Sequence, residues 1–279
     1  MKNKHTAFSF SILLFFLFFG TKVHAQNVDS ILFSNTAWHD HLIKKGIIWK
    51  QANIQGIFGS QQEINIIEVD LKKHGKKIHL AALPKSREKT STLAQQHDAI
   101  LALNGGFFDM KNGGAVDFIK VKHQIINTTV TKSARANAYL AFDHKKLLIT
   151  DDSTQSGAYP NILLAGPLLL KDGLSYPLSK NAFNDNRHPR TAIALKGNKL
   201  ILLTVDGRNA KSQGLTLGEL EKIFRWYGCQ SAMNLDGGGS TTMYIKGQAD
   251  HGVVNYPSDN KLFDHKGERA VSNIIYLTN

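Results

Sequence analysis

Cysteine is nearly absent from this sequence: Cys229 is the only one among 279 residues. A single cysteine excludes an intramolecular disulfide, so the stability of the fold must come from its hydrophobic core. Apolar residues lie close to Cys229 in the chain, and this favours a buried structural thiol over a catalytic nucleophile.

Three other signals are missing as well. After residue 25, no stretch is apolar enough to span a bilayer. The twelve histidines include no HExxH motif and no close His/Cys set, so they predict no metal site, and no motif requires a cofactor. The lysines and arginines form no run interleaved with aromatic residues, which argues against a nucleic acid partner.

The N-terminus holds the one long apolar segment. A basic start precedes an apolar stretch over residues 8–19, and residues 23–25 offer small side chains at a cleavage position. This pattern is typical of a secretory signal peptide over residues 1–25, because the apolar part is shorter than the ~20 residues of a membrane span. We therefore expect an exported protein, periplasmic or extracellular, whose mature chain begins near Gln26.

The chain is basic, with a formal net charge of +12. Removal of Lys2, Lys4 and Lys22 with the signal peptide leaves 12 − 3 = +9. Such an excess raises the local concentration of anionic partners. The charge favours phosphate-bearing or acidic glycans as partners, with a solvated basic surface as the simpler alternative.

Short apolar segments separated by glycine turns predict a strand-rich domain. We expect strands near 64–71, 78–83, 99–103, 119–126, 138–142, 146–150, 162–165, 168–170, 192–195, 200–205 and 270–277. The first two are predicted to pair as a hairpin, and so are 192–195 and 200–205 across Gly197-Asn198. Residues 26–60 are interpreted as a polar lead-in.

One helix is predicted from local signals alone. Thr216 and Glu219 form a capping box, apolar residues then recur at helical spacing, and Gly228 ends the pattern. No internal repeat or low-complexity linker is present. A single α+β domain with mixed or antiparallel sheets is the simplest account.

Four polar segments share one pattern. Each follows an apolar strand and contains glycine or arginine next to residues with charged, amide or hydroxyl side chains. They are residues 104–109, 190–191, 206–208 and 234–242. The last contains Gly237, Gly238 and Gly239, and three consecutive glycines are expected where backbone takes positive φ or makes a close approach. Exposed N–H groups in such a turn suit a phosphate. An ordinary Asp-Gly hairpin turn is the alternative.

This succession of motifs resembles the phosphodiester glycosidase family. The matching segments are ALNGGFFD (102–109), GPLLL with DG (166–173), HPRTAIAL (188–195), LLTVDGR (202–208), GLTLGELEKIF (214–224), MNLDGGGSTTM (233–243) and ERAVSN (268–273). The resemblance covers residues 98–279, and residues 26–97 are then a lead-in of the same globular unit. It implies sheets around a central helix, for which residues 216–227 are the candidate. It also implies cleavage of a sugar-1-phosphodiester, of the N-acetylglucosamine-1-phosphate type, at the sugar C1–O bond.

The residues suggest how such a reaction is catalysed. Glycoside cleavage passes through an oxocarbenium-like state and usually employs two carboxylates, for which Asp206 and Asp236 are the best pair. Since phosphate is already a good leaving group, cations that stabilise it matter more than a strong acid, and we expect this role from Arg208. The expected substrate contacts are Asn104, Gly105, Gly106, Arg190, Thr191, Asn234, Gly237, Gly238, Gly239, Ser240, Thr241 and Arg269.

Several alternatives stay open at this point. Asp206 and Asp236 could be turn-forming residues, and Arg190 could belong to a structural ion pair. The side-chain oxygens of Asp109, Asn112 and Asp117 could bind Ca²⁺, although they lack EF-hand spacing. The function itself has two rivals: a non-catalytic phosphoglycan-binding or exopolysaccharide-assembly protein, and a phosphodiesterase that cleaves the P–O bond.

Overall fold

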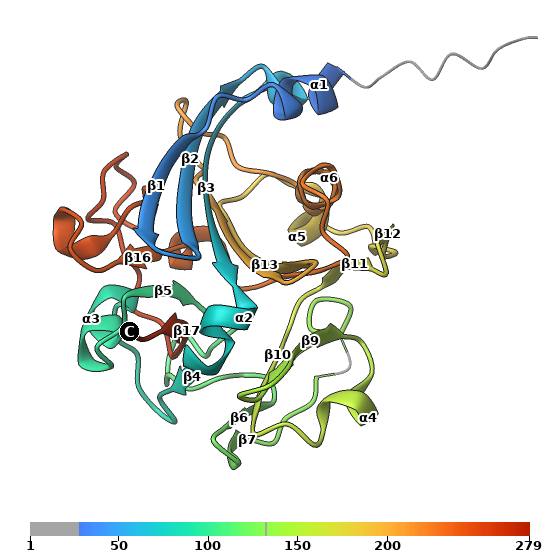
Figure 1. Cartoon of the computed structure of the whole chain (residues 1–279), viewed down its shortest axis with the longest axis vertical. Coiled ribbons are helices and arrows are strands. Elements are labelled where there is room, and N and C mark those ends of the chain that lie inside the picture. Colours follow the sequence, from blue (N-terminus) through green and yellow to red (C-terminus); the bar gives the residue numbers. More distant parts are fainter. Residues whose placement is uncertain (1–27, 132) are drawn as a thin grey trace, which may run out of the picture.

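The computed structural model describes residues 28–131 and 133–279, so the signal peptide predicted over residues 1–25 lies outside the described residues. Its largest element is an eight-stranded antiparallel sheet (Figure 1). The strand order is β1 (His39–Lys44), β2 (Ile47–Gln55), β3 (Gln61–Asp70), β14 (Lys199–Val205), β13 (Arg190–Lys196), β15 (Ser231–Asn234), β11 (Leu168–Lys171) and β12 (Leu174–Ser175). Because β3 pairs with β14, the N-terminal strands and the C-terminal half share one sheet.

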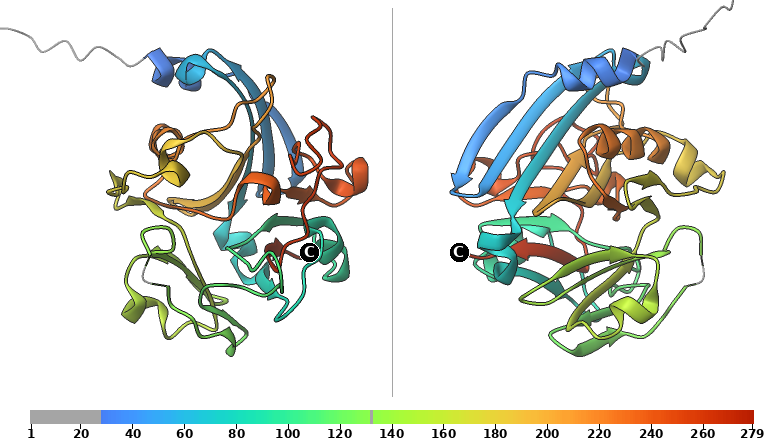
Figure 2. Two further views of the ribbon diagram at one scale, coloured as in Figure 1. Left: turned by 180° about the vertical axis from the view of Figure 1, so that it is seen from behind. Right: turned by 45° about the vertical axis from the view of Figure 1, so that its right-hand side comes forward.

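Two smaller antiparallel sheets form the lower part of the molecule in Figures 1 and 2. The five-stranded sheet has the order β7 (Gln124–Asn127), β6 (Ile119–Val121), β10 (Asn161–Ala165), β8 (Ala138–Phe142) and β9 (Leu147–Thr150). The four-stranded sheet has the order β16 (Met243–Ile245), β5 (Leu101–Asn104), β17 (Asn273–Leu277) and β4 (Ile78–Ala82).

The helices are short apart from one. They are α1 (Val28–Ser34), α2 (Leu71–His74), α3 (Thr90–Gln96), α4 (Ser153–Ser156), α5 (Ala182–Asp185) and α6 (Leu217–Trp226), with 3₁₀ turns η1 (Ile57–Gly59), η2 (Gly75–Lys77), η3 (Gly238–Ser240) and η4 (Asp250–Gly252). The capping box predicted for α6 is present, with Thr216 and Glu219 bonding each other's backbone. Gly228 follows the helix with a φ of 84°, as its role as a terminator requires.

The two faces of the large sheet bury different cores. On one face, Leu220 and Phe224 of α6 pack with side chains from β2, β3, β13 and β14. The other face contributes residues such as Ile67 to a second cluster, which joins it to both smaller sheets. The α+β fold class and single domain are therefore confirmed, and α6 covers the sheet face that lies opposite the smaller sheets.

The local pairings were predicted with mixed success. Strands β13 and β14 pair across Gly197-Asn198, with Lys196 opposite Lys199, as the hairpin prediction required. The hairpin predicted for β3 and β4 is wrong: α2 and η2 separate these strands, β3 joins the large sheet, and β4 pairs with β17. The lead-in is not simply polar, because β1 and β2 form two of the large sheet's strands.

No helix in the described part of the chain is long and apolar enough to cross a membrane. Cys229 is buried with 3% of its surface exposed, and burial raises the pKa of its thiol to about 12. The thiol is therefore protonated at neutral pH, as expected for a structural cysteine.

Candidate active site

The glycine loop, residues 236–240, leaves the end of β15 and packs against the backbone that enters β13. The N–H of Gly238 donates to the Pro189 carbonyl at 2.8 Å. A β-carbon at Gly237 would lie 2.6 Å from the same oxygen, so only glycine permits this approach. The loop is therefore a close-packed element of the fold as well as a turn.

Two arginines cover the other side of the glycine loop. A β-carbon at Gly238 would lie 2.9 Å from Nη2 of Arg208, and one at Gly239 would lie 2.5 Å from Nη2 of Arg269. Gly238 also has a φ of 63°, which favours glycine. The run of glycines is explained by these close approaches, since guanidinium groups lie where side chains would otherwise be.

The backbone of Asp236 is clamped by the end of β5. Its N–H donates to the Gly105 carbonyl at 3.0 Å, and its carbonyl accepts a 2.7 Å bond from Nδ2 of Asn104. Asn104 is held in turn, because its Oδ1 accepts from the Thr191 hydroxyl at 2.7 Å and from the Thr242 N–H at 3.0 Å. These bonds fix the position from which the Asp236 side chain projects.

Asp236 is partly exposed, and its carboxyl group lies where burial and positive charge act on its pKa in opposite directions. Burial raises its pKa to about 6, and this effect prevails over the lowering by the Ser240 hydroxyl, the Arg269 guanidinium, the Gly237 N–H and the Arg135 guanidinium. A carboxyl group poised near neutral pH beside two cations has the properties of a catalytic group.

Beside the glycine loop is a cavity of about 250 Å³. Its lining residues are Gly207, Arg208, Asn209, Ser258, Asp259, Lys261, Leu262 and Arg269. Arg269 forms an ion pair with Asp259, and its Nε donates to that carboxylate at 2.9 Å. Arg208 is exposed and bonds to none of the described residues, so its guanidinium is free to bind an anion.

Asp206 occupies a different environment from Asp236. It is fully buried, and its Oδ1 accepts a 2.8 Å bond from Nδ2 of Asn255 and a 2.9 Å bond from the Tyr256 N–H. Burial raises its pKa to about 7, with a further upward contribution from the charge of Glu63. Asp206 is thus enclosed by the fold, whereas Asp236 is partly exposed.

Comparisons with known proteins identify the family of the chain. The family model described as phosphodiester glycosidase matches residues 97–278, well over half of the chain. The chain belongs to the phosphodiester glycosidase family. Two of its curated relatives are N-acetylglucosamine-1-phosphodiester alpha-N-acetylglucosaminidases. The enzyme of Mus musculus is 26% identical over 57% of this chain, and that of Bos taurus is 27% identical over 63%. A third relative, the uncharacterized prophage-derived protein YomE of Bacillus subtilis (strain 168), is 26% identical over 58% of this chain. The matches span only 27–36% of those relatives' own lengths.

Solved structures share the family fold. The catalytic domain of the zebrafish N-acetylglucosamine-1-phosphodiester alpha-N-acetylglucosaminidase, auto-inhibited by its pro-peptide, has a TM-score of 0.64 at 22% identity, with 88% of this chain and 85% of that domain covered. A hypothetical protein from Synechocystis has a TM-score of 0.65 at 18% identity, with 86% of this chain and 63% of that one covered. At these identities the structures support the fold alone.

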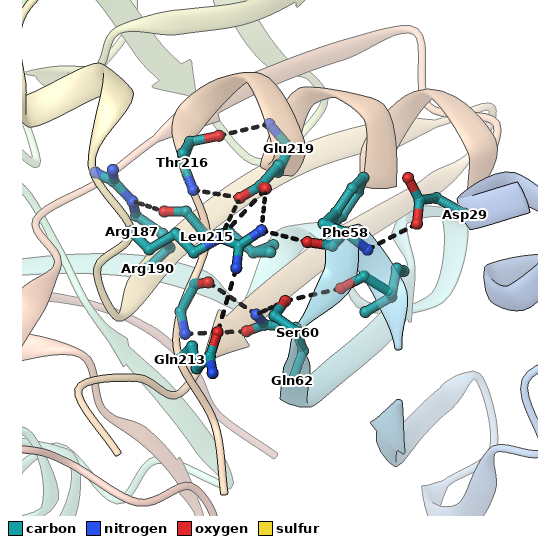
Figure 3. Close-up of polar contacts among 12 residues, drawn as sticks. Asp29, Phe58, Ser60, Gln62, Arg187, Arg190, Gln213, Leu215, Thr216 and Glu219 are labelled. Carbon is teal, nitrogen blue, oxygen red and sulfur yellow. Dashed lines mark hydrogen bonds and ion pairs between the residues drawn. The ribbon is translucent and has the colours of Figure 1, made fainter. Parts of the chain in front are cut away.

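Arg190 does not lie where a phosphodiester would reach it. Its side chain is 1% exposed, with Nε donating to the Leu215 carbonyl at 2.8 Å and Nη2 donating to the carbonyls of Phe183 and Asn186 (Figure 3 shows the bond to Leu215). Burial lowers its pKa to about 10, so it stays charged at neutral pH. The expected substrate contact is corrected on this ground: Arg190 joins three backbone segments.

The side chain of the neighbouring Arg187 likewise joins separate segments of the fold. Figure 3 shows its guanidinium between Glu219 of α6, the Phe58 carbonyl of η1 and the Gln213 side chain. The ion pair with Glu219 adds to the capping box and ties the lead-in to α6. Glu219 is thereby a structural residue, as its capping-box spacing favoured.

Several other predicted substrate contacts are occupied by the fold. The side chains of Asn104 and Thr191 bond to each other, and Nδ2 of Asn234 donates to the Gly166 carbonyl at 2.9 Å. A β-carbon at Gly105 would lie 2.1 Å from Oδ1 of Asn273, and Gly106 donates its N–H to the same oxygen. All five residues are buried, so they position Asp236 and the strand ends and do not face a substrate.

The hydroxyls of the glycine loop lie beneath it. Ser240 and Thr241 are 0% exposed, and neither hydroxyl has a hydrogen-bond partner of good geometry among the described residues. Ser240 nevertheless lies close enough to Asp236 to lower the pKa of its carboxyl. The Ser240 hydroxyl thus acts on the Asp236 carboxyl from the buried part of the loop, while Gly237 and Gly238 are partly exposed.

The calcium alternative gains no support from the geometry. One Asp109 oxygen accepts the N–H groups of Lys111 and Asn112, and the other accepts Nδ2 of Asn112, so the carboxylate closes its own turn. Nowhere in residues 28–131 and 133–279 do three His, Cys, Asp or Glu side chains converge on a possible metal position.

Sequence reasoning missed Arg135. It follows no glycine motif, and its relation to the site arises only in three dimensions, where its guanidinium lies 4.2 Å from the centre of the Phe107 ring and acts on the Asp236 carboxyl. The contact also shows that Phe107 is a buried platform for an arginine. Lys261 was missed as well, and it lines the cavity from a loop that carries no strand-end signal.

Proposed function

We propose that this protein is an exported hydrolase that cleaves the C1–O bond of a sugar-1-phosphodiester on a phosphorylated glycan or cell-surface polymer. The observation that carries the proposal is the setting of Asp236: the charges of Arg269 and Arg135 act on its carboxyl, and the glycine loop that follows it is approached by Arg208 and Arg269, which line the cavity. A carboxylate for the sugar and cations for the phosphate are the two parts that this reaction needs.

The phosphate is assigned to the cavity. Arg208 and Arg269 approach the exposed side of the glycine loop, and guanidinium groups bind phosphate oxygens through paired N–H donors. When the C1–O bond breaks, the electron pair stays on the phosphate oxygen, and the diester monoanion becomes a phosphomonoester with a second negative charge. Arginines that bind this developing charge more strongly than the ground state accelerate the step.

Asp236 is assigned to the sugar side of the bond. In its ionised form it stabilises the oxocarbenium-like sugar, either by direct attack at C1 or by activating water. Asp206 is reassigned from catalysis to positioning, because it is fully buried and bonds to Asn255 and Tyr256. Asn104 is likewise a positioning residue that acts through the Asp236 backbone.

The relatives narrow the substrate class. The mouse and bovine relatives are named for cleavage of N-acetylglucosamine-1-phosphodiesters, which makes this sugar the first to test. Export is proposed from the signal peptide pattern over residues 1–25.

A product assay tests the function. N-acetylglucosamine-1-phosphomethyl ester is expected to yield free sugar and methyl phosphate with wild-type protein, and Asp236→Asn is expected to abolish the release while keeping the thermal unfolding temperature. In water enriched in heavy oxygen, the label should appear on the sugar. Label on phosphate would favour P–O cleavage, and tight binding without turnover across a panel of sugars would favour a binding protein.

A further inference from the structure

The cavity has two walls: the residues of one approach the glycine loop closely, and those of the other do not. Nη2 of Arg208 is the atom nearest to a β-carbon added at Gly238, whereas Nη2 of Arg269 and Oδ1 of Asp259 lie equally near, at 2.5 Å, to one added at Gly239. Lys261 and Leu262 line the same cavity, but neither is among the atoms nearest to those glycines. The cavity therefore extends from the glycine loop, to which the phosphate is assigned, to a wall that includes Lys261 and Leu262.

Lys261 and Leu262 belong to a loop, residues 256–267, that is held rigidly. The Tyr256 ring stacks on Phe263 with ring centres 4.1 Å apart and on His265 at 4.4 Å. The ends of the loop touch, since a β-carbon at Gly267 would lie 2.1 Å from the Pro257 carbonyl oxygen. A loop fixed in this way adds little backbone ordering cost when its side chains bind a ligand.

The fold makes little use of the side chains that this loop turns towards the cavity. Lys261 is exposed, and its amino group bonds to none of the described residues. Leu262 is 60% exposed, and the buried Ser258 hydroxyl has no partner within the described ranges. A cation and an apolar surface are thus available on one wall.

The charges of the cavity exceed those of a phosphodiester. Three cations (Arg208, Lys261 and Arg269) and one carboxylate (Asp259) line it, which gives 3 − 1 = +2. The phosphodiester brings one negative charge. A phosphodiester held by Arg208 and Arg269 offsets one of these two charges, which leaves 2 − 1 = +1, and Lys261 is the remaining lining cation and forms no ion pair with a described carboxylate.

We propose that Lys261 binds a second anionic group, carried by the alcohol on the far side of the phosphate, and that Leu262 contacts the short carbon chain between them. The inference rests on the proposed function for the orientation of the substrate. A volume of about 250 Å³ equals about eight water volumes at roughly 30 Å³ each, enough for a phosphate and a short chain. The preferred leaving group is therefore the phosphate ester of a small hydroxy acid or a similarly acidic unit.

The test uses product-type phosphomonoesters, which contain no glycosidic bond and bind without turnover. Glycerol 3-phosphate and 3-phosphoglycerate are nearly equal in size and differ by one carboxylate. Calorimetry with wild-type protein is expected to show about fivefold tighter binding of 3-phosphoglycerate, the scale of a partly exposed ion pair. Lys261→Gln should remove this preference while leaving the affinity for glycerol 3-phosphate within about twofold.

Lys266→Gln is the matched control, because Lys266 is an exposed lysine of the same loop that does not line the cavity. It should keep the fivefold preference. Equal affinity of wild-type protein for both ligands would overturn the inference, and so would binding of neither. An equal loss for both ligands in Lys261→Gln would overturn it too, because Lys261 would then bind the phosphate itself. Sugar release in the product assay is measured separately, so failure of the proposed reaction is distinguished from failure of this subsite.

Discussion

The Arg208 guanidinium covers Gly238 so closely that a β-carbon at residue 238 would lie 2.9 Å from Nη2. Both residues have left-handed backbone, with φ values of 62° and 63°. For Arg208 this conformation is strained, and such strain concentrates at functional sites where surrounding structure enforces it. The Arg208 guanidinium therefore occupies the space that a side chain at residue 238 would need. We make four predictions, which begin with this pair and continue with the other arginines and aspartates.

Gly238→Ala should lower kcat/KM by at least about tenfold, a loss of about 1.4 kcal/mol in transition-state binding, because the methyl group displaces the Arg208 guanidinium. Steady-state kinetics on the methyl phosphodiester measures this. Gly247→Ala is the matched control, since Gly247 has a φ of 86° and an added β-carbon would meet nothing within 4 Å. Equal loss in both variants would assign the effect to backbone strain alone.

Arg208 and Arg190 should respond in opposite ways to substitution. Arg208→Ala is expected to reduce kcat by about a hundredfold with an unchanged unfolding temperature, since its guanidinium bonds to no described residue. Arg190→Met should cost at least about 2 kcal/mol of unfolding free energy, because it leaves the carbonyls of Leu215, Phe183 and Asn186 without their donor. Denaturant unfolding paired with kinetics checks both; a stable but inactive Arg190→Met protein would restore Arg190 to the substrate site.

The pH dependence of the reaction should follow Asp236. Since the ionised carboxylate is the active form in the proposal, kcat/KM should rise with pH through about 6 and then level off. Arg269 lowers the pKa of Asp236, so Arg269→Gln should shift the rise to higher pH. A pH–rate profile that falls above pH 6 would instead show that Asp236 acts as an acid.

Asp206 should make the free energy of unfolding fall as pH rises, which is the direction opposite to that of most aspartates. Burial raises its pKa to about 7, so its contribution to stability is fully present below its unfolded pKa near 3.8 and is lost as pH rises to about 7. The unfolding free energy of Asp206→Asn relative to wild type should therefore rise across this window, by an amount on the order of 4 kcal/mol.

The control for that measurement is Asp264→Asn. Backbone and side-chain hydrogen bonds hold the pKa of Asp264 below its ordinary value, so its contribution is present at neutral pH and is lost as pH falls. The two variants should change with pH in opposite directions. A flat difference between Asp206→Asn and wild type from pH 4 to 7 would contradict the buried, proton-binding state of Asp206.

The sequence by itself determined the features that depend on neighbours in the chain. The capping box of Thr216 and Glu219, the end of α6 at Gly228 and the β13–β14 turn at Gly197-Asn198 all formed as predicted, because capping bonds and tight turns involve residues only a few positions apart. The motif series also indicated the family, which the family model confirms over residues 97–278.

Tertiary structure alone decided which polar side chains face a substrate. Arg190 and Arg208 both follow the pattern of a polar strand end, yet one is fixed by carbonyls from distant segments and the other stays unpaired. Asp206 and Asp236 each precede a glycine. Asp206 is buried and accepts hydrogen bonds from Asn255 and Tyr256. The backbone of Asp236 is instead held by Asn104 and Gly105, beside two arginines. The partners come from segments up to 132 residues away in the chain, so no local pattern distinguishes the positioning residue from the candidate catalytic one.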